Sequence, residues 1–456
     1  MAMIRGGKIS TTVWLSVATL AAYGACLALN WPGHFSPDGL WQLGQGRSGV
    51  YNSWHPSIMA WLLGLAAKVS PDAGPFFAVD AALFFLSLLG FALARGPPRQ
   101  LALFALSTAA LSPLAVIYQG AVLKDVLFAD LSVAGFACLA WSDRLAGHRA
   151  LVSLVIAKAF GLFALATLAR QTGFVTPLCG AAALVAILRG RGVGWRGAVG
   201  GGLGALIATG ALVAAGSLAL ASHGDGRPEN HHQMQRLQAW DVAGALHFDP
   251  HLSLPATRAS APELEAYLRL DAAPLWRAAT SDNIANPPAF EPLMTPRAEG
   301  VGKDWIGLIL RRPDLYLAVR SRVFLATLAT PAADACPMVI IGVDQSDMQV
   351  LEMARLKPRY SPRDAFDEGY ASAFYRTPIF SHLAWGVLLI VAMALAIRDV
   401  HRGACNADLI VVIFMGAAAL LYVAGYFVIS DACDYRYLYF IDVAAMAMLV
   451  HRAALP

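Results

Sequence analysis

Hydrophobic residues in this chain are gathered into long runs that short polar segments separate. Three stretches, 203–222, 379–397 and 409–430, contain no Asp, Glu, Lys or Arg. An α-helix needs roughly 20 such residues to cross a bilayer core of about 30 Å. The pattern predicts an all-α polytopic membrane protein with about ten transmembrane helices, at 11–30, 76–94, 101–119, 121–141, 150–169, 173–188, 198–222, 379–397, 408–430 and 435–451.

Composition supports this fold class. Of the 456 residues, 57% are hydrophobic and 14% are charged, whereas soluble domains carry about 25% charged residues. A cytosolic enzyme, a nucleic-acid-binding domain and a disordered chain are therefore excluded. The length of the apolar runs also excludes a β-barrel, whose strands would show alternation over about 10 residues. The first apolar run lacks an A-x-A cleavage site, so we expect it to remain as the first span.

The basic residues of the short connections predict the orientation. Cytoplasmic loops retain Lys and Arg, and alternate connections hold nearly all of them. These clusters are Arg5 and Lys8, Arg95 and Arg99, Arg144 and Arg149, Arg189, Arg191 and Arg196, Arg398 and Arg402, and Arg452. We therefore expect a multi-pass protein of a bacterial cytoplasmic (inner) membrane with both termini in the cytoplasm.

Two segments of the outer face are too long to be simple connectors, and loops of that length are usually functional. They divide the chain into an N-terminal module of seven spans (1–222, with the first outer loop at 31–75), an outer domain (223–378) and a C-terminal module of three spans (379–456). Residues 55–69 and 304–324 have the pattern of interfacial helices. We expect the rest of 223–378 to form a small periplasmic or extracellular cap.

Two of the six cysteines, Cys336 and Cys433, lie on the predicted outer face. That compartment permits disulfides, so we predict a bond between them, subject to a geometry that the sequence does not supply. Cys26, Cys138 and Cys179 fall in apolar spans, where packing explains them.

Ionisable residues at a membrane face cost free energy unless they are paired or functional. On the outer face they fall into four groups: Asp38 with Gln42 and His55; Lys124 with Asp125; Arg170 with Gln171; and Asp431, Asp434 and Arg436. Because all four groups lie at the same face, one cleft could collect them. Asp80, Asp130, Lys158 and Asp442 fall inside the spans, where pairing between helices is the simpler explanation.

Asp38 follows the first span directly. Pro37 and Gly39 favour a tight turn that keeps the Asp38 carboxylate out of a helix, although an ordinary turn or N-cap aspartate would look the same. Nearby Trp41, Trp54 and Trp61 offer apolar surface for a sugar ring or a lipid.

Lys124 and Asp125 are adjacent on a predicted helix, where their side chains point about 100° apart and cannot readily pair with each other. An anionic phosphate would suit Lys124, and a divalent cation would suit Asp125. Arg170 either extends to the membrane surface or holds a lipid phosphate bidentately. Arg436 lies within a run of tyrosines that a membrane-interface belt explains, but the belt does not explain the arginine.

This layout resembles the GT-C superfamily of integral membrane glycosyltransferases, which are related to protein mannosyltransferases and lipid A aminoarabinose transferases. The matching features are Asp38 in the first outer loop, His55-Pro56 at the start of an interfacial helix, Asp125 in the next outer loop, and a late hydrophilic domain. Two features depart from the family: Gly39 follows Asp38 where a second acid is expected, and many members have more spans.

The resemblance implies transfer of a sugar from a polyprenyl-phosphate donor to a lipid, glycan or protein acceptor, with membrane lipids around the protein. It implies that Asp38 is the catalytic base and that Asp38 and Asp125 could hold a divalent cation, Mg²⁺ or Mn²⁺. Donor-phosphate binding would fall to His55, Lys124, Arg170 and Arg436. Substrate binding would fall to Trp41, Gln42, Trp54 and Gln171.

A flippase or transporter of a lipid-linked or small anionic substrate is the alternative. Transporters usually have repeated halves with broken spans near the midplane. The sequence shows no such repeat, and most of its unusual charges lie at one face. A structural factor for envelope assembly is a third possibility, which would leave those charges unexplained.

Overall fold

The computed structural model describes residues 10–52, 55–221, 223–224, 230–279, 299–329, 336, 338–344, 348–404 and 406–455. In this part of the chain every regular element is a helix, and strand-like pairing is limited to isolated bridges. The prediction of an all-α polytopic membrane protein is confirmed, because several helices are long and apolar enough to cross a bilayer.

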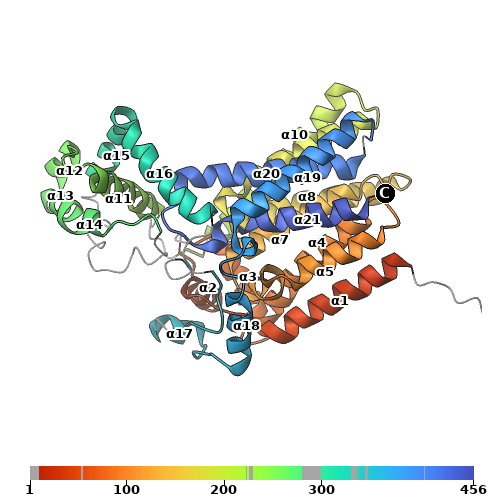
Figure 1. Cartoon of the computed structure of the whole chain (residues 1–456), viewed down its shortest axis with the longest axis horizontal. Coiled ribbons are helices and arrows are strands. Elements are labelled where there is room, and N and C mark those ends of the chain that lie inside the picture. Colours follow the sequence, from red (N-terminus) through yellow and green to blue (C-terminus); the bar gives the residue numbers. More distant parts are fainter. Residues whose placement is uncertain are drawn as a thin grey trace, which may run out of the picture.

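Eight of the ten predicted spans are such helices. They are α1 (Thr11–Asn30), α4 (Gly74–Leu93), α8 (Arg149–Ala169), η2 (Gln171–Phe174) with α9 (Val175–Gly190), α10 (Trp195–Ala221), α19 (His382–His401), α20 (Ala407–Ile429), and η8 (Tyr435–Leu438) with α21 (Tyr439–Ala454). The start of α1 and the C-terminus lie at the same end of the bundle (Figure 1), as an even number of crossings requires.

The other two predicted spans differ from a simple helix. The third is broken: α5 (Gln100–Leu111) is followed by α6 (Pro113–Val116) and η1 (Tyr118–Gly120), with a bend of 66°. Pro113 explains the break, because proline lacks an N–H and disfavours helix at the preceding residue. The fourth, α7 (Lys124–Ala140), has 17 residues and is buried along nearly its whole length.

Side chains from other elements donate to two carbonyls of α6, the short helix after the break. The Asn30 amide donates to the Val116 carbonyl at 2.6 Å, and the Tyr439 hydroxyl donates to the Leu114 carbonyl at 2.7 Å. Irregular backbone at membrane depth is tolerated where protein buries it. The break is thus a packed feature of the bundle.

Two carboxylates inside the spans have partners from other elements. Asp442 of α21 accepts from the Tyr435 hydroxyl at 2.8 Å and lies 2.9 Å from His382 Nδ1 of α19. Asp130 of α7 accepts from the Gln119 amide at 3.0 Å. These contacts lower the cost of burying an acid in the membrane.

The outer cap has a hydrophobic core of its own, which includes Trp240, Leu268 and Trp276. It is built from α11 (Asn230–Phe248), α12 (Pro255–Ser260), α13 (Pro262–Tyr267), η3 (Leu268–Ala272), α14 (Ala273–Leu275), α15 (Glu299–Arg311) and α16 (Pro313–Leu328). Buried Arg320 of α16 pairs with Asp241 of α11 at 3.1 Å and donates to the Val428 carbonyl of α20 at 2.7 Å. This arginine joins the cap to the bundle.

The prediction of one interfacial helix over 304–324 is wrong. The helix ends at Arg311 and a second begins at Pro313. Proline is favoured at the first position of a helix and disfavoured in its interior. The two pieces are α15 and α16, and both contribute to the cap core.

The first outer loop folds into α2 (Pro37–Ser48) and α3 (Ser57–Ala67). These helices touch at Gly46, where an added Cβ would approach the Ala60 carbonyl oxygen to 2.1 Å. Two helices from the end of the predicted outer domain pack here as well: α17 (Met348–Ala354) contacts α2, and α18 (Pro362–Ser372) contacts α1 (Figure 1). Both outer segments therefore support the region that carries Asp38.

Candidate functional site

The segment between α1 and α2 is held on two sides by backbone hydrogen bonds. His34 N–H donates to the Gly120 carbonyl at 2.8 Å, and Phe35 N–H donates to the Gly342 carbonyl at 2.9 Å. Its partners come from the turn before α7 and from the late outer segment. These bonds fix where the following helix begins.

Ser36 caps α2 and so places Asp38. The Ser36 hydroxyl accepts from Gly39 N–H at 3.2 Å, and Pro37 is the first helical residue. The prediction of a non-helical turn at Asp38 is therefore wrong, since Asp38 lies in the first helical turn. Ser followed by Pro is a helix-start signal, and an acid is favoured at that end of the helix dipole.

The Asp38 carboxylate contacts two predicted phosphate-binding residues. Arg436 Nη1 donates to Asp38 Oδ2 at 2.7 Å, and His55 Nε2 lies 3.6 Å from Asp38 Oδ1. Lys124 Nζ lies 3.0 Å from His55 Nδ1. Because an ammonium group only donates, His55 Nδ1 accepts and the ring proton sits on Nε2, facing Asp38. The Asp38 side chain remains 29% exposed, so a substrate could reach it.

These contacts set the charges of the site. Burial alone would raise the pKa of the Asp38 carboxyl, but the charges of Arg436 and Lys124, together with the neighbouring His55 ring, hold this pKa well below its usual range. Burial and the neighbouring Lys124 ammonium together outweigh the effect of Asp38 and lower the pKa of His55 to about 3. At neutral pH the site therefore holds an ionised Asp38 and a neutral His55.

A second arginine lies beside the first. Arg170, at the end of α8, forms an ion pair with Asp125 of α7 and donates to the Tyr426 hydroxyl. Its guanidinium lies 5.7 Å from the centre of the Tyr437 ring, and the Arg436 guanidinium lies 5.4 Å from the same ring. Tyr437 therefore links the two arginines into one site.

Arg436 has a further acidic partner in its own segment. Its Nε lies 2.7 Å from the Asp434 carboxylate, and its backbone N–H donates to Asp434 at 3.1 Å. Both side chains are buried. A guanidinium held on two sides in this way has a fixed position before any substrate arrives.

The predicted substrate-binding residues are not joined to this cluster. Gln42 is buried on α2, Trp41 is 37% exposed on the same helix, and Gln171 is exposed at the start of η2. In the described part of the chain, no hydrogen bond or ion pair connects them to Asp38 or Arg436. Trp54 lies outside the described residues.

Sequence reasoning missed two members of the site, Tyr426 and Tyr437, and gave no role to a third, Asp434. Asp434 was only one of several outer-face charges, Tyr437 looked like part of an interfacial belt, and Tyr426 falls in an apolar span. The sequence signal for Asp434 was its position two residues before Arg436. Two ionisable residues so close together at a membrane face need partners.

The expected divalent cation does not fit the carboxylates proposed to hold it. Asp38 and Asp125 each already contact an arginine. Among the described residues, one group of His, Cys, Asp or Glu side chains is close enough to hold an ion, and neither Asp38 nor Asp125 belongs to it. We therefore derive no catalytic step through a metal at these two carboxylates.

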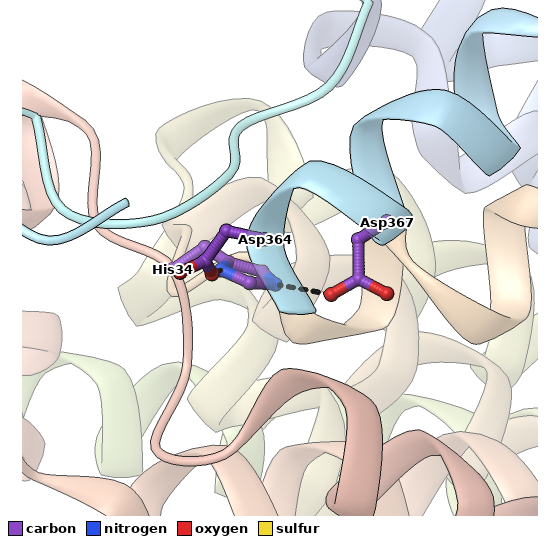
Figure 2. A group of neighbouring side chains, drawn as sticks. All are labelled: His34, Asp364 and Asp367. Carbon is purple, nitrogen blue, oxygen red and sulfur yellow. Dashed lines mark ion pairs between the residues drawn. The ribbon is translucent and has the colours of Figure 1, made fainter. Parts of the chain in front are cut away.

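That group is His34, Asp364 and Asp367, which are fully buried between α18 and the segment after α1 (Figure 2). The Asn30 amide uses its N–H groups on the Cys26 and Val116 carbonyls. Its oxygen must therefore accept from His34 Nε2, at 2.8 Å.

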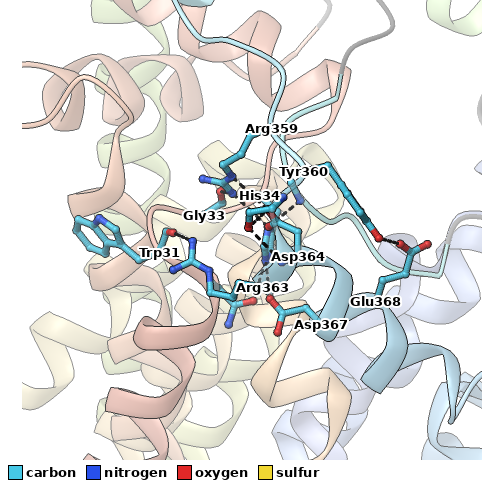
Figure 3. Close-up of polar contacts among 12 residues, drawn as sticks. Trp31, Gly33, His34, Arg359, Tyr360, Arg363, Asp364, Asp367 and Glu368 are labelled. Carbon is cyan, nitrogen blue, oxygen red and sulfur yellow. Dashed lines mark hydrogen bonds and ion pairs between the residues drawn. The ribbon is translucent and has the colours of Figure 1, made fainter.

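The other ring nitrogen of His34 is also engaged. Nδ1 accepts from Gly342 N–H at 2.9 Å. Burial and the neighbouring charge of Arg359 together lower the pKa of His34 to about 3, so the ring is neutral. Arg359 and Arg363 border the two aspartates and donate to the Gly33 and Trp31 carbonyls, respectively (Figure 3). With both nitrogens taken, we assign His34 to holding the Asp38 segment in place.

Cys336 and Cys433 are joined by a disulfide with their Cα atoms 5.3 Å apart. Cys433 directly precedes Asp434 in the sequence. The bond ties the late outer segment, which also pairs with Phe35, to the turn that carries Arg436.

No protein-family model matches the chain, and no curated protein matches it. Among solved structures, it is similar to the archaeal oligosaccharyltransferase AglB from Archaeoglobus fulgidus in complex with an inhibitory peptide and a dolichol-phosphate, with a TM-score of 0.42 and 12% sequence identity. The match covers 96% of this chain and 50% of that chain, so the chain spans half the length of that protein. Similarity at this level establishes neither a fold family nor an activity.

Proposed function

We propose that this protein is a GT-C-type membrane glycosyltransferase, which moves a sugar from a polyprenyl-phosphate donor to a lipid, glycan or protein acceptor at the outer face of the membrane. One observation carries the proposal. Asp38, His55, Lys124, Arg170 and Arg436 come from five separate segments, and their contacts form one charged cluster. A partly exposed carboxylate beside several fixed cations suits an acceptor hydroxyl and a donor phosphate.

The bond changes of the proposed reaction are simple. The bond between the sugar C1 and the phosphate oxygen breaks, and its electron pair stays on the phosphate. The acceptor oxygen bonds to C1, and its proton passes to the Asp38 carboxylate. The transition state is oxocarbenium-like, so negative charge grows on the phosphate, where Lys124, Arg170 and Arg436 would stabilise it.

Asp38 is a weak base in this arrangement, because Arg436 keeps its pKa low. The acceptor hydroxyl becomes acidic only as its oxygen bonds to C1, so its proton leaves late in the reaction. A weak base that is ionised at every physiological pH suffices for such a late transfer. Arg436 also fixes the direction in which the Asp38 carboxylate points.

The transporter alternative is less consistent with the bundle. Transporters bind substrate at broken spans near the midplane, where backbone groups are left available. Here Asn30 and Tyr439 donate to two carbonyls of α6, which follows the break after α5. The charged cluster lies elsewhere, where the first loop meets the start of the last span.

Purified protein incubated with radiolabelled polyprenyl-phosphate sugars and membrane acceptors tests the proposal. We expect a labelled product with at least one donor and release of polyprenyl phosphate. Asp249→Asn is a suitable control variant, because Asp249 pairs with Arg312 in the cap at 2.7 Å, outside the cluster. Transport of an intact labelled donor across vesicles, with no product, would favour the alternative.

A further inference from the structure

Among the described residues of the site, positively charged side chains are as many as carboxylates. Asp38, Asp125 and Asp434 supply three negative charges, and Lys124, Arg170 and Arg436 supply three positive ones; His55 is neutral. A dication bound here would add two further charges beside guanidinium groups that cannot lose theirs. The repulsion would be strong, because nearby charges interact strongly where water is excluded.

The carboxylate that would anchor such an ion is also blocked. Asp125 is 2% exposed, and Arg170 contacts it directly. The Arg170 side chain is itself held by the Tyr426 hydroxyl and lies against the Tyr437 ring. A metal could reach Asp125 only if this arginine left a position in which several groups hold it.

We propose that the guanidinium groups of Arg170 and Arg436 take the place of a divalent cation, so that the site binds a lipid phosphate without metal. This inference rests on the proposed function for the identity of the ligand. A guanidinium has five N–H donors, so an arginine that binds a carboxylate on one side can donate to a phosphate on another. Tyr437 lies against both groups and keeps their spacing fixed, as a metal ion would otherwise do.

The arrangement also assigns different tasks to the two arginines. Arg436 contacts Asp38 directly and therefore sits where the sugar and the acceptor hydroxyl would meet. Arg170 contacts Asp125, so we place it nearer the phosphate. Its loss should weaken phosphate binding and leave the Asp38–Arg436 pair in place.

Binding of a polyprenyl monophosphate without sugar tests the inference separately from turnover. Protein in nanodiscs is titrated with this lipid in EDTA and again in Mn²⁺, and its metal content is measured by mass spectrometry. We expect wild-type affinities within about twofold of each other and no stoichiometric metal. Arg170→Ala should bind about tenfold or more weakly in EDTA, since a charge-assisted hydrogen bond is worth about 1.5–3 kcal/mol.

Two variants serve as controls. Arg191→Ala removes a matched arginine from the opposite membrane face, where it pairs with Asp143 at 2.8 Å, and should bind lipid like wild type. The double variant Asp125→Asn/Arg170→Gln removes both charges together, so it avoids an unpaired buried acid if Arg170→Ala is unstable. It should show the same loss of binding as Arg170→Ala.

A stoichiometric divalent cation in wild-type protein that Asp125→Asn abolishes would overturn the inference. So would a tenfold loss of lipid binding in EDTA that Mn²⁺ restores. If wild-type protein binds no polyprenyl phosphate under either condition, the proposed function fails instead. The metal contents of wild type and Asp125→Asn would still decide whether arginine replaces metal at this site.

Discussion

The carboxylate of Asp38 and the guanidinium of Arg436 are 2.7 Å apart, although 398 residues separate them in the sequence. One belongs to the helix after the first span, and the other opens the last span. Their contact means that the site exists only when both ends of the chain have assembled. Changes at either end should therefore affect the same chemistry.

Titration of Asp38 and His55 should leave kcat/KM unchanged between about pH 5 and 8. Arg436 keeps the pKa of Asp38 well below its usual value of about 4, and burial lowers that of His55 to about 3. In Arg436→Gln, Asp38 should titrate closer to pH 4 and activity should fall earlier on acidification. An acid limb near pH 6 in wild type that His55→Gln removes would contradict these assignments.

Loss of the disulfide should affect both stability and the site. The bond closes a loop over a sequence separation of 97 residues, for which chain entropy predicts a contribution of about 4–5 kcal/mol. The double variant Cys336→Ser/Cys433→Ser should melt at lower temperature and lose activity, because Arg436 follows Cys433 closely. Non-reducing peptide mass spectrometry should recover the linked pair from wild type. Free thiols at both positions, in protein alkylated during lysis, would show that this disulfide is absent.

The hydrophobic pattern predicted the bundle because a span must be apolar and must satisfy its own backbone. The same pattern did not predict the break at Pro113, because the apolar run continues through the proline whereas the helix ends before it. The same reasoning failed at Pro313, where a run of alternating apolar residues suggested one helix. In both places the proline indicated that the helix ends, but the prediction followed the hydrophobic pattern instead.

Asp367→Asn should stabilise the protein at neutral pH. Burial, together with Asp364, raises the pKa of Asp367 to about 6, whereas the unfolded value is about 3.9. The folded state holds this proton more tightly, so the free energy of unfolding falls as pH rises from about 4 to 6. We expect a gain of about 1–3 kcal/mol at pH 7.5 that disappears near pH 4.

Unfolding curves at both pH values measure this effect. Asp364→Asn is the matched control and should destabilise, because the Asp364 carboxylate accepts from Ser361 N–H at 2.7 Å in the capping box of α18. Lower stability of Asp367→Asn at pH 7.5 would show that the charge of this carboxylate is needed.

Single-cysteine labelling should show the predicted topology. Cysteines at Arg189 and Arg402, which lie in the basic connections, should react only after the membrane is made permeable. A cysteine at Leu270 of the cap, where the side chain is 75% exposed, should react from outside in intact cells. The reverse pattern would place the site on the face where nucleotide sugars and ATP are found.

Position along the chain was enough to predict that the cations of the site lie near one another, because each one lies where a predicted span meets the outer face. The pairings were not predictable in this way. Asp125 pairs with Arg170 and Asp38 with Arg436 because of how the helices pack, and nothing in the sequence reports that. Asp364 and Asp367 were missed for another reason: they lie in a polar segment, where charged residues are common and give no signal.

The most direct test is product formation by Asp38→Asn at saturating donor, with melting temperature measured in parallel. The amide keeps the size of the side chain but cannot take the acceptor proton. We predict a loss of about 10² to 10⁴ in rate with donor binding retained and the fold intact, while Asp249→Asn stays near wild type. Loss of a general base should cost at least about 10² in rate. A well-folded Asp38→Asn protein whose turnover stays within about threefold of wild type would therefore contradict the role of Asp38 as the base.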